Sequence, residues 1–173
     1  GRNHRFVIAT KRIDELRSKP QNEWKLLDAT SPLYYLFPNI QLSFGDGSVS
    51  LIKIYPDPEN PTDPGRSRTR VVHYFSQERI DQVTQASDDV HRVTAENAYD
   101  FDGESQAVLT LSAFTEVFDS TIEKEDYVMG AHQQRTAESG QLEHQIFGRN
   151  EPALHHYHNH FREALGMSPL ERI

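Results

Sequence analysis

Two stretches of the sequence carry side chains that could bind a metal ion. Residues 123–126, Glu-Lys-Glu-Asp, are acidic, and residues 151–160 are rich in histidine. If the acidic stretch is helical, Asp126 shares a face with Ile122 and Met129, because residues three and four apart lie on one side of a helix. A carboxylate on the buried side of a helix needs a partner, and a cation is one such partner. The alternative is a solvated helix face, which composition alone favours.

The histidine-rich stretch suggests a different kind of site. His156 and His160 are four residues apart, the spacing at which two imidazoles on one helical face can share a metal ion. No Glu follows His156 as in HExxH, so the metalloprotease form of this motif is absent. A metal-dependent hydrolase that uses these histidines remains one hypothesis. The alternative is an exposed histidine face opposite an apolar stripe of Leu154, Tyr157, Phe161 and Leu165.

Composition excludes several other classes of function. The chain has no Cys, which rules out disulfides, thiolate nucleophiles and an iron–sulfur cluster held by cysteine. Lys and Arg number 18 against 26 Asp and Glu, a net charge of −8 that argues against nucleic-acid binding. No apolar run is long enough to span a membrane, and no glycine-rich phosphate-binding motif or GxSxG occurs. We therefore expect a cytoplasmic protein without a nucleic-acid or membrane partner.

The N-terminal half of the chain predicts a β-sheet. Its β-prone runs cover residues 5–10, 33–44 (broken at Pro38-Asn39), 49–55 and 69–75. Gly45-Asp46-Gly47 predicts a hairpin turn, because glycine accepts positive φ. The prolines of residues 56–65 predict an exposed loop. The last three runs would form an antiparallel meander, and its apolar face needs a cover.

That cover is expected from the C-terminal half. Apolar residues at helical spacing predict one long helix, or two abutting helices, over residues 107–135, packed across the sheet in a single domain, residues 1–173. A second helix should begin at Pro152 and end at Gly166. The aromatic residues of the strands would fill the core or line an apolar pocket between sheet and helix. They are Tyr34, Tyr35, Phe37, Phe44 and Tyr74.

Several short motifs occur in a characteristic order. Residues 31–41 read Ser-Pro-Leu-Tyr-Tyr-Leu-Phe-Pro-Asn-Ile-Gln, and they are followed by Glu125-Asp126, Gln134-Arg135, Ser139-Gly140 and residues 148–154. Together they resemble the catalytic domain of the large (alpha) subunits of Rieske-type aromatic ring-hydroxylating oxygenases. The resemblance runs from about residue 5 to about residue 165. Each motif is short, and their order and spacing make the resemblance specific.

The resemblance implies an α+β helix-grip fold (START-like, SRPBCC), an antiparallel sheet around a long C-terminal helix. It also implies a mononuclear non-haem Fe2+ held by two histidines and one carboxylate, an arrangement that leaves positions open for O2. Asp126 matches the position of that carboxylate. The intact enzyme would take electrons from a reductase or ferredoxin through a [2Fe-2S] centre, act on a small aromatic or similarly apolar substrate, and assemble as a homotrimer.

Two parts of the family pattern are missing from this sequence. The [2Fe-2S] centre needs cysteines that the chain lacks. The family's histidine ligands lie in a D-x-x-H-x-x-x-x-H stretch upstream of the Phe-Pro-Asn strand, where this chain has only His4. His155 and His160 have the right mutual spacing, but they follow Asp126 and no Asp lies three residues before His155, so they are not assigned as ligands.

We therefore expect the C-terminal part of such a catalytic domain, incomplete on its N-terminal side and inactive on its own. In this part Asp126 would be more exposed than in a complete domain. The alternative is a non-enzymatic helix-grip module that binds a small apolar ligand, with Asp126 as an ordinary satisfied polar residue.

Overall fold

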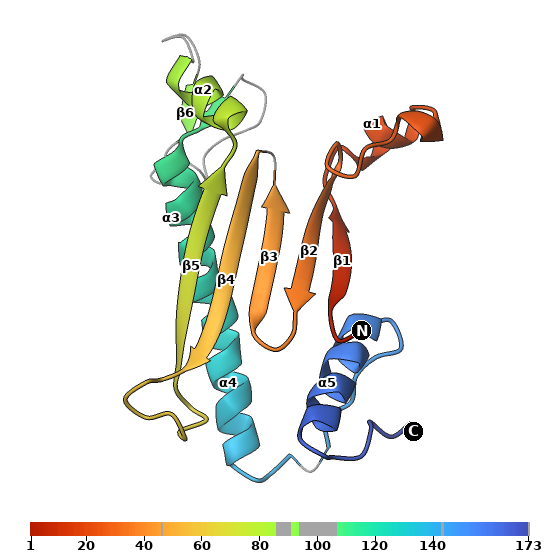
Figure 1. The fold of residues 1–173 in the computed structure, drawn as a ribbon, viewed down its shortest axis with the longest axis vertical. Helices are drawn as coiled ribbons and strands as arrows, with labels where there is room; N and C mark the ends of the chain where they lie inside the picture. Colours follow the sequence, from red (N-terminus) through yellow and green to blue (C-terminus); the bar gives the residue numbers. More distant parts are fainter. Residues whose placement is uncertain (46, 86–90, 94–106, 143, 173) are drawn as a thin grey trace. The chain divides into compact units, whose positions relative to one another are not determined.

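The computed structural model describes residues 1–45, 47–85, 91–93, 107–142 and 144–172 (Figure 1). The chain divides into two compact units. Unit 1 comprises Gly1–Val72 and His144–Ile173, and unit 2 comprises His73–Glu143. An open five-stranded antiparallel sheet and a long helix give the α+β class predicted from the sequence, consistent with a helix-grip fold. No helix among the described residues is long and apolar enough to cross a membrane.

The large sheet is a simple meander in which each strand pairs with the next along the chain. Its strands are β1 (His4–Ala9), β2 (Thr30–Leu36), β3 (Ile40–Gly45), β4 (Ser48–Pro56) and β5 (Ser67–Phe75). The sheet therefore has two edges, β1 and β5. β5 runs through the boundary between the two units, since Val72 belongs to unit 1 and His73 to unit 2.

Local sequence explains the turns of this meander. β3 and β4 pair up to Gly45 and Ser48, and Gly47 has φ 65°, so the predicted hairpin is confirmed. Residues 33–44 form two strands instead of one, because Pro38 has no N–H for a ladder and the chain turns back there. The loop between β4 and β5 is largely exposed, as its prolines predict.

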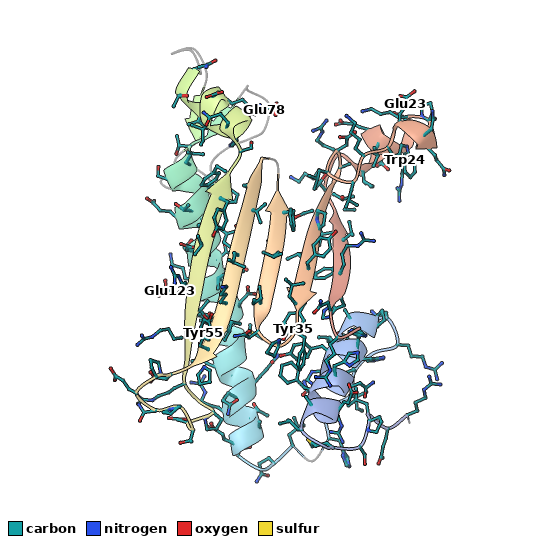
Figure 2. All side chains as sticks on the ribbon, in the orientation of Figure 1. Glu23, Trp24, Tyr35, Tyr55, Glu78 and Glu123 are labelled. Carbon is teal, nitrogen blue, oxygen red and sulfur yellow. The ribbon has the colours of Figure 1, made fainter. Side chains whose placement is uncertain are left out.

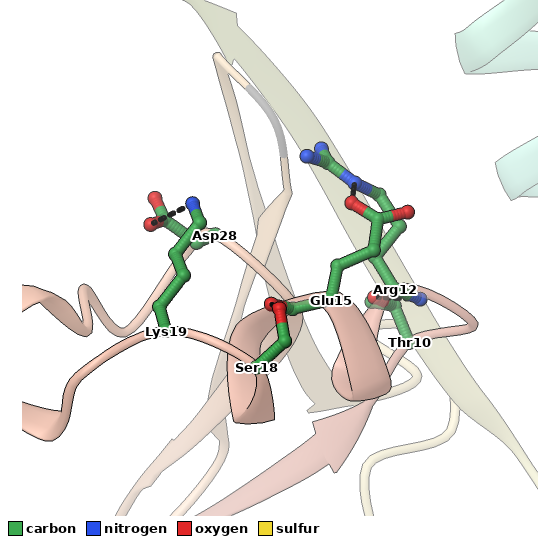
Figure 3. A network of polar contacts seen from close by, with 6 residues as sticks. All are labelled: Thr10, Arg12, Glu15, Ser18, Lys19 and Asp28. Atoms are coloured by element: carbon green, nitrogen blue, oxygen red, sulfur yellow. Dashed lines mark hydrogen bonds and ion pairs between the residues drawn. The ribbon is translucent and has the colours of Figure 1, made fainter.

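A short helix, α1 (Ile13–Arg17), follows β1 and is held mainly by local contacts (Figure 3). The Arg12 side chain donates to Glu15 at 3.1 Å, and Lys19 lies 4.0 Å from Asp28. Such surface ion pairs contribute about 0–1 kcal/mol each. Leu16, which is almost fully buried, is the apolar anchor of this helix. A 3-10 turn (Gln21–Glu23) then leads toward β2.

Unit 2 contains the long helix of the chain. Its elements are α2 (Gln77–Gln85), the parallel pair β6 (His91–Val93) and β7 (Ala107–Leu109), α3 (Leu111–Thr121), a π-helical turn (Ile122–Asp126) and α4 (Tyr127–Glu138). The helix was expected to start at residue 107, but it starts at Leu111. Thr110 is extended, and its hydroxyl accepts a hydrogen bond from the Ala113 N–H, which caps the helix.

The last helix, α5 (Pro152–Ala164), belongs to unit 1 and matches its prediction. Pro152 stands in its first turn, and Gly166, with φ 70°, follows its end. In unit 1 α5 contacts β1, and Tyr35 of β2 lies against α5 (Figure 2).

The aromatic side chains of the strands are only partly buried. Tyr74 is 55% exposed, so the prediction that it lies in the core is wrong. Side chains alternate between the two faces of a strand, and the neighbouring residues His73 and Phe75 lie on the packed face.

Candidate functional site

Asp126 occupies the last position of the π-helical turn within the long helix. The Tyr127 N–H donates to the carbonyl of Ile122, five residues back, where an α-helix would bond four residues back. The loop closed by this hydrogen bond therefore contains one residue more than the corresponding loop of an α-helix. Isolated π turns of this kind are often found at functional sites. The sequence predicted a helix here but not its irregular turn.

The Asp126 side chain is exposed, so of the two alternatives drawn from the sequence the solvated helix face is confirmed and the buried face is wrong. The reason is that α4 itself is almost entirely exposed, and Tyr127, Val128 and Met129 are all exposed apolar residues. Within the described part of the chain, no hydrogen bond or ion pair engages the Asp126 carboxylate. The pKa of the Tyr127 hydroxyl is raised, first by burial and then by the negative charge of Asp126.

The N-terminal half of the long helix is anchored by aromatic contacts to the end of β5 within unit 2. The His73 ring meets Phe114 and Phe118 edge-on at 5.6 and 5.2 Å, and Phe75 meets Phe114 at 5.5 Å. His73 Nε2 lies 3.0 Å from a carboxylate oxygen of Asp119. These contacts fix α3 just before the π turn.

The histidines of α5 are not on a fully exposed face. Tyr157 and Phe161 pack against Tyr35 and Phe37 at 4.9 Å each, whereas Leu154 and Leu165, two members of the expected apolar stripe, are exposed. His156 and His160 are half-buried, with ring centroids 4.3 Å apart. The packed side of α5 therefore includes both aromatic and histidine residues.

A third histidine joins this group from β1. The His4 ring lies 5.4 Å from that of His156 and stacks on Tyr35 at 5.0 Å. Burial, and next the neighbouring His156, lower the pKa of His4. The Glu163 carboxylate lies 3.0 Å from His160 Nδ1 and 3.5 Å from Arg2, and these contacts, led by the His160 hydrogen bond, lower its pKa. Sequence reasoning missed His4, since nothing local links it to α5.

The described residues do not form a complete site for mononuclear iron. No group of three or more His, Asp or Glu side chains among them is placed to hold a metal ion. Asp126 lies in unit 2, whereas His4, His156 and His160 lie in unit 1. A shallow depression of about 450 Å³ on α4, lined by His132, Arg135, Thr136 and Ser139, does not include Asp126. Among the described residues, no histidine pair joins Asp126 to complete the ligand set that the resemblance implies.

Comparison with known proteins identifies the family. Residues 5–167 match the family described as "Ring hydroxylating alpha subunit (catalytic domain)". Since the match covers nearly the whole chain, the chain belongs to this family, as the resemblance in the sequence indicated. Neither the curated proteins nor the solved structures contain a significant match to it.

Proposed function

We propose that this chain is the C-terminal part of the catalytic domain of a ring-hydroxylating oxygenase. In this proposal Asp126 supplies the carboxylate ligand of a mononuclear Fe2+, and the half-buried aromatic residues contribute to the wall of the substrate pocket. The reaction class is O2-dependent hydroxylation of an aromatic or similarly apolar compound. The two histidine ligands would come from residues outside this chain.

The observation that carries the proposal is the position of Asp126. It lies in the part of the chain that matches the family, at the end of a π-helical turn, and its exposed carboxylate has no partner among the described residues. A carboxylate without a protein partner is available to a cation, and oxygen donors of this kind complete the two-histidine, one-carboxylate iron sites of oxygenases.

The partners follow from the family. An electron-transfer reductase or ferredoxin would deliver electrons through a [2Fe-2S] centre carried outside this chain, since the chain has no Cys. A cytoplasmic homotrimer is the assembly that we propose. Two measurements on the intact enzyme test these proposals. Its oligomeric state tests the homotrimer, and identification of its electron donor tests the reductase or ferredoxin. Neither measurement depends on the role of Asp126.

The proposal is tested by Asp126→Ala in the complete alpha subunit. Iron affinity and turnover should fall by roughly 100-fold or more, because even an outer hydrogen-bond partner of a metal ligand is worth about 10- to 100-fold. The absorbance of the [2Fe-2S] centre should persist. Metal analysis and substrate-dependent O2 consumption measure the two effects.

Glu125→Ala is the matched control, since it removes a carboxylate from the same π-helical turn and should leave iron and turnover close to the parent values. Retained iron and turnover in Asp126→Ala would contradict the assignment. A complete subunit that binds an apolar ligand without any O2 consumption would instead support the non-enzymatic helix-grip module.

A further inference from the structure

Three imidazole rings gather in unit 1, between β1 and α5. His156 is the central ring, 5.4 Å from His4 and 4.3 Å from His160 between ring centroids. His4 comes from the first strand of the sheet, and the other two come from adjacent turns of one helix. These contacts lie within a single compact unit, and β1 and α5 are in contact there.

The spacing of the rings fits ligands of one ion. An imidazole nitrogen binds a metal such as zinc at about 2 Å, so two rings on one tetrahedral ion have centroids about 5 Å apart. The two separations, 5.4 and 4.3 Å, lie on either side of this value.

The second observation is that two of the rings have unsatisfied nitrogens. Nδ1 of His4 and Nε2 of His156 are buried and have no hydrogen-bond partner among the described residues. Buried polar atoms are nearly always paired, and each exception calls for an explanation such as a missing ion. A lone pair on each nitrogen is what a metal ion would need.

The third ring is oriented by an acidic neighbour. His160 Nδ1 lies 3.0 Å from the Glu163 carboxylate, which also lies 3.5 Å from Arg2. When Nδ1 donates its proton to a carboxylate, the lone pair is on Nε2, and metal-binding histidines commonly have this arrangement. Glu163 would then act as a positioning residue for His160.

We propose that His4, His156 and His160 bind one divalent transition-metal ion of the kind that prefers imidazole, such as Zn2+. The side chains are not yet in a three-ligand geometry, so binding would turn the rings toward one another. All three ligands belong to unit 1, and the role of the site is to tie β1 to α5.

Calorimetric titration of the tag-free, chelator-treated chain with Zn2+ tests the proposal. We expect one Zn2+ per chain and a rise in Tm with saturating metal. His4→Phe and His156→Phe keep an aromatic ring and remove the nitrogens, and each should weaken binding at least tenfold. His155→Phe is the matched control: it lies on the same helix, beside Phe147 and outside the cluster, and should bind as the parent does.

A further variant tests the proposal even if the histidine-to-phenylalanine variants fail to fold. Glu163 is exposed, so Glu163→Gln should fold normally by circular dichroism and weaken Zn2+ binding about tenfold, the scale of an outer-partner effect. Asp126→Asn should leave Zn2+ binding unchanged, which separates this site from the proposed iron ligand. Unchanged affinity in His156→Phe and Glu163→Gln, or equal loss in His155→Phe, would overturn the proposal.

Discussion

The contact between His73 and Asp119 is the polar link that accompanies the aromatic anchoring of α3. The His73 side chain is only 8% exposed, and its Nε2 lies 3.0 Å from a carboxylate oxygen of Asp119, which is half exposed. A hydrogen bond that reaches a nearly buried ring is worth more than a surface ion pair, because water cannot easily replace it. This link is therefore expected to contribute measurably to the stability of unit 2.

We expect Asp119→Ala to lower the free energy of unfolding by about 1 kcal/mol, the usual net value of such a hydrogen bond. Asp119→Asn retains a carbonyl oxygen at the same place and should cost less. Urea denaturation followed by circular dichroism measures both. Equal losses in the two variants would show that the hydrogen bond does not stabilise the fold.

The stability of unit 1 should depend on pH through its histidines. The pKa values of His4 and His158 are lowered from 6.5, in both cases mainly by burial. The unfolded chain therefore binds more protons than the folded chain just below the ordinary histidine pKa, and stability falls as pH drops from about 7 toward the folded-state values. Unfolding measured in the presence of a chelator should show this loss.

The substitutions His4→Phe and His158→Phe should each flatten that pH dependence, since the ring that must remain neutral is gone. Stability curves for the parent chain and both variants, measured between about pH 5 and 7.5, test this. An unchanged slope in both variants would show that neither histidine is responsible for the dependence.

Individual site residues differ in how far the sequence could predict them. The helix around Asp126 follows from apolar residues at helical spacing, a local pattern. The exposure of Asp126 depends on what packs against α4, and local spacing does not report that. The approach of His4 to His156 depends on the pairing of β1 with β2 and on the docking of α5, so no local pattern contains it.

The long helix of unit 2 is the element that positions Asp126. Its π-helical turn separates α3, which is anchored to the end of β5, from α4, which is largely exposed. The extra residue in this turn sets the direction of every α4 side chain relative to α3. The same sequence in an uninterrupted α-helix would present a different residue at the position of Asp126.

Deleting Lys124 should convert the π-helical turn to α-helix. The deletion is absorbed within the turn, so α4 keeps its register with α3, but the narrower α-helical turn, with about 3.6 residues per turn, holds the Asp126 carboxylate at a different place. In the complete subunit we expect helix content to be retained and iron to be lost. Circular dichroism and metal analysis measure these two quantities.

Lys124→Ala is the control for this deletion, since it removes the side chain and keeps the residue count. It should retain iron. If the deletion variant also retains iron, the π-helical turn does not position the metal ligand.

The elements themselves were predictable where local signals are strong. Gly47, Pro152 and Gly166 mark a turn, a helix start and a helix end, and the structure places each accordingly. The start of α3 was predicted too early. Val108 and Leu109 fit the spacing of apolar residues in a helix, but Thr110 caps the helix, which therefore begins only at Leu111. The π-helical turn has no comparable signal in its residue types.

At the scale of the whole chain, the two compact units carry different candidate sites. Unit 1 holds the three-histidine cluster, and unit 2 holds Asp126. No described residue group completes a three-ligand metal site in either unit as it stands. In our proposal the histidine ligands of the iron come from outside this chain, whereas the proposed ligands of Zn2+ all lie within unit 1.

The isolated chain should accordingly bind no stoichiometric Fe2+ through Asp126 and show no O2-dependent turnover, because one carboxylate cannot hold the ion alone. Anaerobic addition of Fe2+, desalting and metal analysis test this. Iron retained by the parent and lost in Asp126→Ala would contradict it. Iron lost instead in His156→Phe would place the ion in the histidine cluster.

β1 forms one edge of the sheet, and this has a consequence for how the chain behaves at high concentration. Its outer backbone groups have no partner strand in the described sheet, and Phe6, Val7 and Ile8 are exposed. Such an edge can pair with the same edge of another copy, and this pairing can begin aggregation. Cationic side chains near the edge, such as Arg5, oppose the pairing because like charges on the two copies repel. High salt should therefore shorten the storage life of the chain, and an ion that tied β1 to α5 would lengthen it.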